Sequence, residues 1–158
     1  TCIYSDMIIN EDTVRVYNIH LASNWFKNTD YSFIQNPQKE KIKEGIIGIT
    51  KRMKSSFIKR AEEVEIIKQH MADCTYPIIV CGDFNDTPLS YAYNSIKGDL
   101  SDAFSISGKG IGDSFVKISA LRIDYILHDN DLKSSNYQKH KQVLSDHYAV
   151  SCEIEIGN

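Results

Sequence analysis

The chain has 158 residues, 42% of them hydrophobic and 25% charged, and its formal net charge is -3. This composition fits one folded unit with a sizeable core and excludes a low-complexity or disordered chain. The small negative charge disfavours a dedicated nucleic-acid-binding protein, because affinity for a phosphate backbone is normally supplied by a cationic surface.

The N-terminal part predicts a β-hairpin followed by a long helix. Residues 2–9 and 13–21 are rich in β-branched and aromatic side chains, and the polar trio 10–12 suits a tight turn. After an aromatic loop over residues 23–37, apolar residues recur at helical spacing, which predicts a helix packed along one face. Two glycines in its first turns leave open whether this is one helix or two. The recurring residues are Ile42, Ile46, Ile49, Met53, Phe57, Ala61, Val64 and Met71.

The remainder of the chain predicts strands with helices inserted between them. Pro77 ends the helical pattern, and residues 78–81 form a short apolar run typical of a strand buried on both sides. This mixture favours a layered α+β fold over a helical bundle or a simple wound βαβ sheet. The later elements are a helix over 89–97, a glycine-rich loop over 107–112, and strands over 121–127 and 148–156.

The cysteines and two of the histidines indicate no site of their own. The four cysteines lack CxxC spacing, so a zinc site is not predicted. We favour free thiols, with a disulfide between Cys74 and Cys81 as the alternative. His128 and His140 lie in loop-like surroundings and are expected at the surface.

Short strings of polar residues stand at the ends of the predicted strands. Asp83 and Asn85, in Gly-Asp-Phe-Asn, follow the most apolar strand, which would hold them rigidly at its tip. Asp and Asn also serve as ordinary turn residues, so this string alone is ambiguous. Asn18 and His20 end the second strand, in Asn-Ile-His-Leu, and point to the same face by the period of two.

Two further strings lie near the C-terminus. Asp146 and His147, in Ser-Asp-His, directly precede the last strand and place a hard-cation ligand beside an imidazole. Asp124, in Arg-Ile-Asp-Tyr, lies in an alternating strand, where a buried carboxylate is costly unless it has a partner. A histidine is its natural partner.

These four strings, in this order, resemble the endonuclease/exonuclease/phosphatase superfamily. The resemblance covers the chain from about Val14 to its end. It implies an α+β fold, the four-layer α/β/β/α sandwich of the deoxyribonuclease I-like type. It also implies a metal-dependent phosphoesterase, that is, hydrolysis of a phosphodiester or phosphomonoester by in-line attack of activated water.

By motif position, the resemblance assigns a role to each catalytic residue. Asp83 would orient or deprotonate the attacking water, and Asn85 would hydrogen-bond a phosphate oxygen. His147, oriented by Asp124, would contact the phosphate and stabilise charge in the transition state. His20 is similar to the histidine that acts near the leaving group.

The resemblance also implies a cofactor and a supporting residue. Asp146 would help to bind the divalent cation, Mg2+ or Mn2+. Asn18, on the same face as His20, would support that histidine or bind the substrate phosphate. A serine or cysteine nucleophile would need an elbow such as Gly-x-Ser-x-Gly, and the sequence contains none.

The family's metal site also uses an asparagine and a glutamate that come before anything in this sequence. We therefore expect residues 1–158 to be a single domain, the C-terminal portion of the family's domain, incomplete at its N-terminus and inactive alone. A missing N-terminal portion or a partner chain would then cover the exposed sheet. The alternative is a catalytically inactive interaction module of the same fold.

The substrate and the cellular location stay open at this level. Relatives act on nucleic acid, phospholipid headgroups or inositol phosphates with nearly the same residues, so the chemistry does not select among them. The chain could be cytoplasmic or attached to a membrane through an upstream segment.

Three other features of the sequence can be interpreted structurally or functionally. The basic residues between 39 and 60 could attract nucleic acid or anionic lipid, although such residues usually only solvate a helix. Trp25, Phe26, Tyr31 and Phe33 could form a substrate rim or pack under the long helix. The glycine-rich loop over residues 107–112 is expected to lie over the site.

Overall fold

A computed structural model describes residues 1–24, 26, 28–35 and 42–157. Its larger sheet has five strands in the order β1-β2-β3-β5-β4, and its smaller sheet pairs β6 with β7. The strands are β1 Cys2–Ile9, β2 Asp12–His20, β3 Ile78–Asp83, β4 Ser101–Asp102, β5 Asp124–His128, β6 Lys133–Lys139 and β7 Val150–Glu155. The helices are α1 Asn28–Gln35, α2 Ile42–Ala72, α3 Tyr91–Lys97 and α4 Ala103–Ser107.

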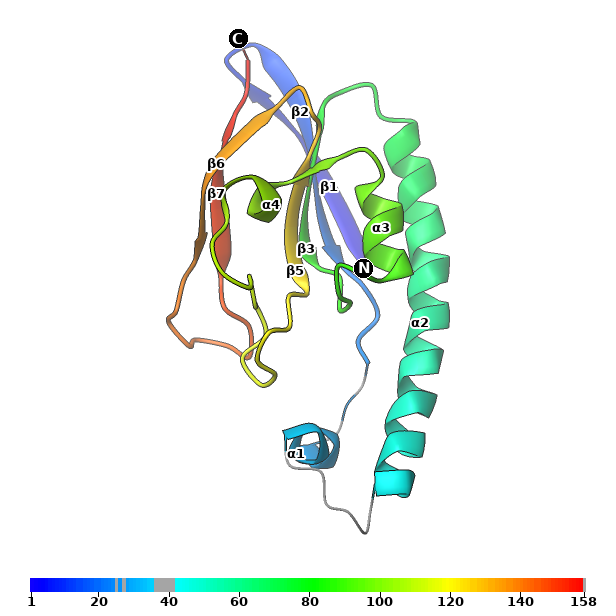
Figure 1. The fold of residues 1–158 in the computed structure, drawn as a ribbon. Coiled ribbons are helices and arrows are strands. Elements are labelled where there is room, and N and C mark those ends of the chain that lie inside the picture. The colour runs from blue at the N-terminus through cyan, green and yellow to red at the C-terminus, as the bar shows by residue number, and fades with distance from the viewer. Residues whose placement is uncertain (25, 27, 36–41, 158) are drawn as a thin grey trace.

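The elements stack in layers, as Figure 1 shows: α2 and α3 cover one face of the larger sheet, and β6 and β7 lie on its other side. The predicted α+β sandwich is confirmed. The residues that the structure describes supply a helix layer and two sheets of it. None of the described helices combines the length and the apolar character needed to cross a bilayer.

The core between the larger sheet and α2 explains why the apolar strand and the helical stripe form where they do. Val64 of α2 and Val80 of β3 are completely buried there, with Ile19 of β2. Burying an aliphatic side chain of this size contributes about 1.5 to 3 kcal/mol. A smaller cluster on the other face joins Val14 and Ile79 to the β6–β7 sheet.

The N-terminal hairpin is confirmed. β1 and β2 pair antiparallel, from Cys2 with Ile19 to Ile9 with Asp12. The two residues between the strands, Asn10 and Glu11, have φ of 50° and 73°. This left-handed pair is the turn whose twist matches that of the flanking strands.

The edge strand β1 leaves apolar side chains in solvent. Ile3 and Ile8 are 63% and 77% exposed. These side chains agree with the expected open apolar surface on the sheet. What covers them stays a prediction.

Several elements differ from the sequence expectation. The region between residues 23 and 37 contains α1, and the polar connection after β5 contains β6. Strand β6 has no apolar alternation and forms because it pairs with β7. The region from 42 to 72 is one helix, which settles the alternative left open by its glycines.

The expectation for His128 was wrong, because this side chain is buried at 1% exposure. Its Nδ1 lies 2.8 Å from the Asp129 carbonyl and its Nε2 2.8 Å from the Ser134 hydroxyl, so both ring nitrogens have partners. His140 is exposed, as expected. The four cysteines are free thiols.

Gly82 provides a test of how closely β2 and β3 approach. Its φ is +134°, and a Cβ placed there would lie 1.9 Å from the Ile19 carbonyl oxygen. We expect Gly82→Ala to lower the free energy of unfolding by at least about 3 kcal/mol, because backbone must shift to relieve this contact. Chemical denaturation measures the change.

Gly110→Ala is the matched control. Gly110 also has a positive φ, +77°, but nothing lies within 4 Å of the point that a Cβ would occupy there. This substitution should cost only the left-handed backbone penalty of about 1 to 2 kcal/mol. Equal losses in the two variants would contradict the proposed close approach at Gly82.

Candidate active site

Three site residues form one row across the larger sheet. His20 ends β2, Asp83 ends β3 and Asp124 begins β5, and the register pairs His20 with Asp83 and Asp83 with Asp124. Neighbouring strands are about 4.8 Å apart, so this register brings the three side chains together. The His20 Nε2 atom lies 3.8 Å from Asp83 Oδ2.

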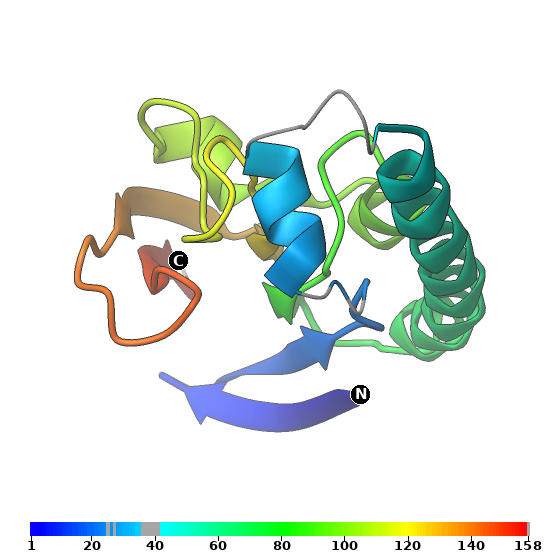
Figure 2. The same cartoon turned by 90° about the horizontal axis from the view of Figure 1, so that it is seen from below.

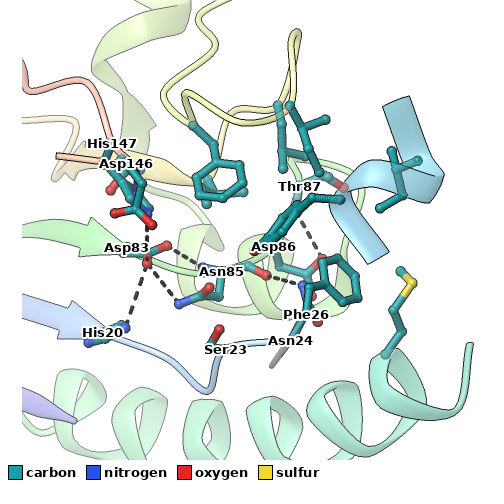
Figure 3. Close-up of a pocket in the computed structure, with 18 of the residues that line it drawn as sticks. His20, Ser23, Asn24, Phe26, Asp83, Asn85, Asp86, Thr87, Asp146 and His147 are labelled. Atoms are coloured by element: carbon teal, nitrogen blue, oxygen red, sulfur yellow. Dashed lines mark hydrogen bonds and ion pairs between the residues drawn. The ribbon is translucent and has the colours of Figure 1, made fainter. Parts of the chain in front are cut away.

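His147 joins this row from the segment that leads into β7. Its Nδ1 lies 2.9 Å from Asp124 Oδ2, and its Nε2 lies 3.9 Å from Asp83 Oδ2. Figure 3 shows Asp83 between His20, Asn85 and His147. The structure thus brings together the five residues to which we assign catalytic roles.

Asn85 fixes the carboxylate of Asp83. Its backbone N–H donates to Asp83 Oδ1 and its side-chain amide to Asp83 Oδ2, both at 2.8 Å. The same amide donates to the Leu21 carbonyl at 3.1 Å. Asn85 has a left-handed φ of 52°, which asparagine tolerates better than most residues. Because both amide hydrogens are engaged, Asn85 orients Asp83 here and would exchange a hydrogen bond to contact a phosphate.

The surroundings shift the pKa values of Asp83 and His147 in the direction that favours proton transfer. Burial raises the pKa of Asp83, and the nearby Asp124 raises it further, against the opposing effects of Asn85, His147 and His20. The hydrogen bond to Asp124 raises the pKa of His147, although burial opposes this. A carboxyl with a raised pKa is a stronger base, and a histidine with a raised pKa is more often a cation at neutral pH.

Asp146 is exposed and lies beside His147 in the same cleft. Burial by itself would raise the pKa of Asp146, but the hydrogen bond to the Lys117 ammonium, 3.3 Å away, lowers this pKa overall. Among the described residues, a group of ligand atoms within 4.8 Å of one another comes from Asp83, Asp124 and His147. The carboxylate that we predicted to bind metal is therefore close to this group but not part of it.

Asn18 is the one predicted site residue that does not lie in the cleft with the others. It is exposed on β2, where its backbone pairs with Cys81, two residues before His20. Among described residues it does not line the cleft that contains Asp83 and His147. Its role as a support of His20 stays a prediction.

The cleft itself is much larger than the row of polar residues. Its volume is about 810 Å³. Figure 2 shows α1 lying across the end of the larger sheet, between α2 and the loop before β5. Phe26 and Tyr31 line the cleft, as the rim hypothesis expected, whereas Phe33 is not among the described residues that line it and Trp25 lies outside the described residues.

The expectation for the glycine-rich loop was wrong. Residues 109–112 line a separate hollow with Tyr137 and Lys139, away from Asp83. Gly112 lies against the ring of Phe104, where a Cβ would come within 2.6 Å of ring carbons. Close packing on α4, which the sequence did not predict, fixes this loop.

Ser114 supports the site and carried no sequence signal, since it is a single serine in a loop. It is completely buried, and its hydroxyl accepts the N–H groups of Ile123 and Asp124, both at 3.0 Å. Its carbonyl accepts the N–H of Tyr148 at 2.7 Å. Ser114 therefore joins the start of β5 to the segment that carries His147.

Arg60 is a second support, and its basic character was misleading. It is completely buried in α2, with its Nε 2.9 Å from Asp86 and its Nη1 2.7 Å from the Ala22 carbonyl. Both of its Nη atoms lie 3.1 Å from Asn24 Oδ1. Its position four residues before Val64 on the buried stripe is the signal that could have identified it.

The remaining basic residues in this part of the chain fall into several groups. Arg52 pairs with Asp30, while Lys51, Lys54 and Lys59 are exposed, as a solvated helix face requires. Lys39 and Lys41 lie outside the described residues.

Arg60→Met should remove the connection between α2 and the two loops of the site. We expect the free energy of unfolding to fall by about 3 to 5 kcal/mol, because Asp86 is left as an unpaired buried charge. Lys59→Met, at the exposed neighbouring position, should change it by less than about 0.5 kcal/mol. Denaturant titrations compare the variants, and a similar effect of both substitutions would contradict this role for Arg60.

Asp124→Asn should lower the pKa of His147 toward 6.5, since the pKa is raised chiefly by the hydrogen bond to Asp124. In the wild type, the stability contributed by protonated His147 is complete below pH 6.5 and is lost as the pH rises through the raised value. Titration of the His147 ring signals by NMR in metal-free protein measures the pKa. The exposed substitution Asp131→Asn is the control, and an unchanged pKa in Asp124→Asn would contradict the assigned pairing.

Comparison with known proteins places this geometry in a family. The sequence profile of the Endonuclease/Exonuclease/phosphatase family matches residues 54–147. A search of curated proteins gave no significant match.

Solved structures share the fold. A mannosyl-6-phosphatase from Bacteroides thetaiotaomicron is 15% identical with a TM-score of 0.58, over 98% of this chain and 57% of that one. The human Nocturnin catalytic domain is 15% identical with a TM-score of 0.57, over 98% and 52%. Sphingomyelinase C from Streptomyces griseocarneus is 15% identical with a TM-score of 0.52, over 94% and 56%.

The chain thus spans slightly more than half the length of these structures, and at these identities the likeness concerns the fold. The profile match covers more than half of the chain and includes the segments that carry Asp83, Asp124 and His147. The chain belongs to the Endonuclease/Exonuclease/phosphatase family.

Proposed function

We propose that this chain carries the catalytic residues of a divalent-metal-dependent hydrolase that cleaves a phosphate ester. The observation that carries the proposal is the row of His20, Asp83 and Asp124, completed by His147 in the same cleft. Membership of the family supports it. Phosphoryl transfer depends on positioning and on charge stabilisation, and this group of side chains offers both.

The charge of the cleft supports the need for a cation. Of the described residues that line it, the acidic ones are Asp83, Asp86, Asp124 and Asp146, and none is a lysine or arginine. A phosphate anion would be repelled from such a cleft unless a cation compensated the carboxylates. Carboxylate oxygens are the ligands that Mg2+ and Mn2+ prefer.

The residues present fit such a cation. Asp146 is the proposed ligand, and the oxygen atoms of Asp83 and Asp124 lie in the same cleft. Asp146 would exchange its contact with Lys117 for the metal. When bound, such a cation would supply positive charge that offsets the negative charge of the phosphate ester.

The chain's own residues divide the remaining work. Asp83, held by Asn85 and made more basic by burial, accepts the proton of the attacking water. His147 keeps Nδ1 on Asp124, so that Nε2, when protonated, donates to a phosphate oxygen as negative charge develops. His20 lies on the other side of Asp83, where it stabilises the departing group.

The second candidate is a non-catalytic interaction module of the same fold. The exposed apolar side chains of β1 favour it, because such a strand is suited to contact another chain. The raised pKa of the half-buried Asp83 favours the enzyme, because placing a carboxylate beside another one in a partly desolvated site is costly without a use.

Hydrolysis of bis(p-nitrophenyl) phosphate by the full-length protein tests the reaction. We expect Mg2+-dependent turnover that falls by at least about a hundredfold in Asp83→Asn, the range for loss of a positioned base. Asp73→Asn, an exposed change at the end of α2, should retain full turnover. Hydrolysis that persists in chelator or survives Asp83→Asn would reject the proposed chemistry.

Cation binding is measured separately from turnover. Mn2+ should broaden the NMR signals of His147 far more than those of His128, which lies at the opposite end of β5 from Asp124, because paramagnetic broadening falls steeply with distance. Equal broadening of the two histidines would exclude a cation site in the cleft.

A further inference from the structure

We propose that the cleft binds its phosphate ester through an alkyl chain, which lies along the apolar wall formed by α1, α2 and the loop before β5. This assignment rests on the proposed function and adds the substrate class, a phosphate ester with a single apolar arm. It follows from the size of the cleft, the chemistry of its wall and the distribution of charge.

The proposed catalytic residues His20, Asp83 and His147 lie at one end of the cleft. The volume of about 810 Å³ is that of a site for a whole organic ligand, far more than one phosphate group fills. In Figure 3, Phe26 lies on the side of the cleft away from Asp83 and His147. The apolar wall consists of Phe26, Tyr31, Ile34, Ile49, Met53, Phe57, Ile118 and Leu121.

The wall favours an alkyl chain over a nucleobase. A base is recognised by hydrogen bonds to its edges and by stacking on open aromatic faces. The Tyr31 hydroxyl is the only polar side-chain group in the wall as defined by its described residues. Its ring already packs against Phe26 and Phe115, with centroids 5.8 and 5.9 Å away. Most of the other wall residues are aliphatic and match a flexible chain.

The distribution of charge disfavours a substrate with several phosphates. The described residues that line the cleft include no lysine or arginine that could pair with a second anionic group. Lys117 lies beside the cleft, with its ammonium 3.3 Å from Asp146 and 5.1 Å from the centroid of Tyr31, and if Asp146 turned to a metal, Lys117 could pair with only one further anionic group. A strand of nucleic acid or an inositol polyphosphate would find little to compensate its charge. One phosphate at the polar end with an uncharged chain behind it fits the cleft.

Binding of alkylphosphonates tests this assignment, because their C–P bond is not hydrolysed. Isothermal titration calorimetry with the full-length protein and Mg2+ compares butyl-, hexyl- and octylphosphonate below their micelle concentrations. Each buried methylene strengthens binding by up to about fourfold, so Kd should fall by at least about tenfold from butyl to octyl. A flat series would overturn the proposal, as would tighter binding of adenosine 5′-monophosphate than of octylphosphonate.

Substitutions in the apolar wall test where the alkyl chain binds. Ile34→Gln, at a residue 38% exposed, and Met53→Gln, at a half-buried one, should each flatten the chain-length series without unfolding the protein. Ile58→Gln, on α2 at 54% exposure and outside the cleft, is the matched control and should keep the full series. An equally steep series in the wall variants would place the chain elsewhere on the protein and overturn the proposal.

The binding series and the hydrolysis assay test two separate proposals, so one proposal can be rejected while the other is kept. Asp83-dependent hydrolysis with a flat series would reject the alkyl site and keep the reaction. A steep, wall-dependent series without Asp83-dependent hydrolysis would reject the reaction and leave an alkyl-phosphate binding site.

Discussion

The register of β2, β3 and β5 is the constraint on which the site depends. It aligns the end of one strand, the end of its parallel neighbour and the start of an antiparallel one, so that His20, Asp83 and Asp124 meet. Gly82 makes this alignment possible, because any larger residue would collide with the Ile19 carbonyl. A shift by one residue would turn these side chains to the opposite face of the sheet.

Buried polar contacts then secure the loops that a sheet alone cannot position. Arg60 joins α2 to the segments after β2 and β3, and Ser114 joins β5 to the segment that carries His147. Behind the site, Arg122 pairs with Asp102 at 2.8 Å in the interior. Desolvating such charges is costly, and they contribute chiefly by fixing one arrangement of the surrounding loops.

The cleft combines two environments that require different partners. Its polar end concentrates carboxylates, among them Asp83 with a raised pKa, and on the proposed function this negative charge would need a cation before an anionic ester could bind. Its other end offers aliphatic and aromatic side chains from three separate segments. On the proposed function, the polar end would act on the phosphate group, and the apolar end would select among phosphate esters.

Local patterns determined the hairpin, the long helix, the buried strand and the polar residues at strand ends, because strand alternation, helical spacing and turn chemistry act over a few residues. The resemblance of four strings to a family, in turn, identified His20, Asp83, Asn85, Asp124 and His147 as a group. Only the tertiary structure decided what depends on contacts between distant segments. It paired β6 with β7, buried His128, placed Arg60 inside, moved the glycine-rich loop away from the site and left Asn18 outside the cleft. Strand β6 forms because β7 lies beside it, and Arg60 is buried because Ala22, Asn24 and Asp86 surround its guanidinium. Such contacts between separate segments are not specified by patterns that extend over a few residues.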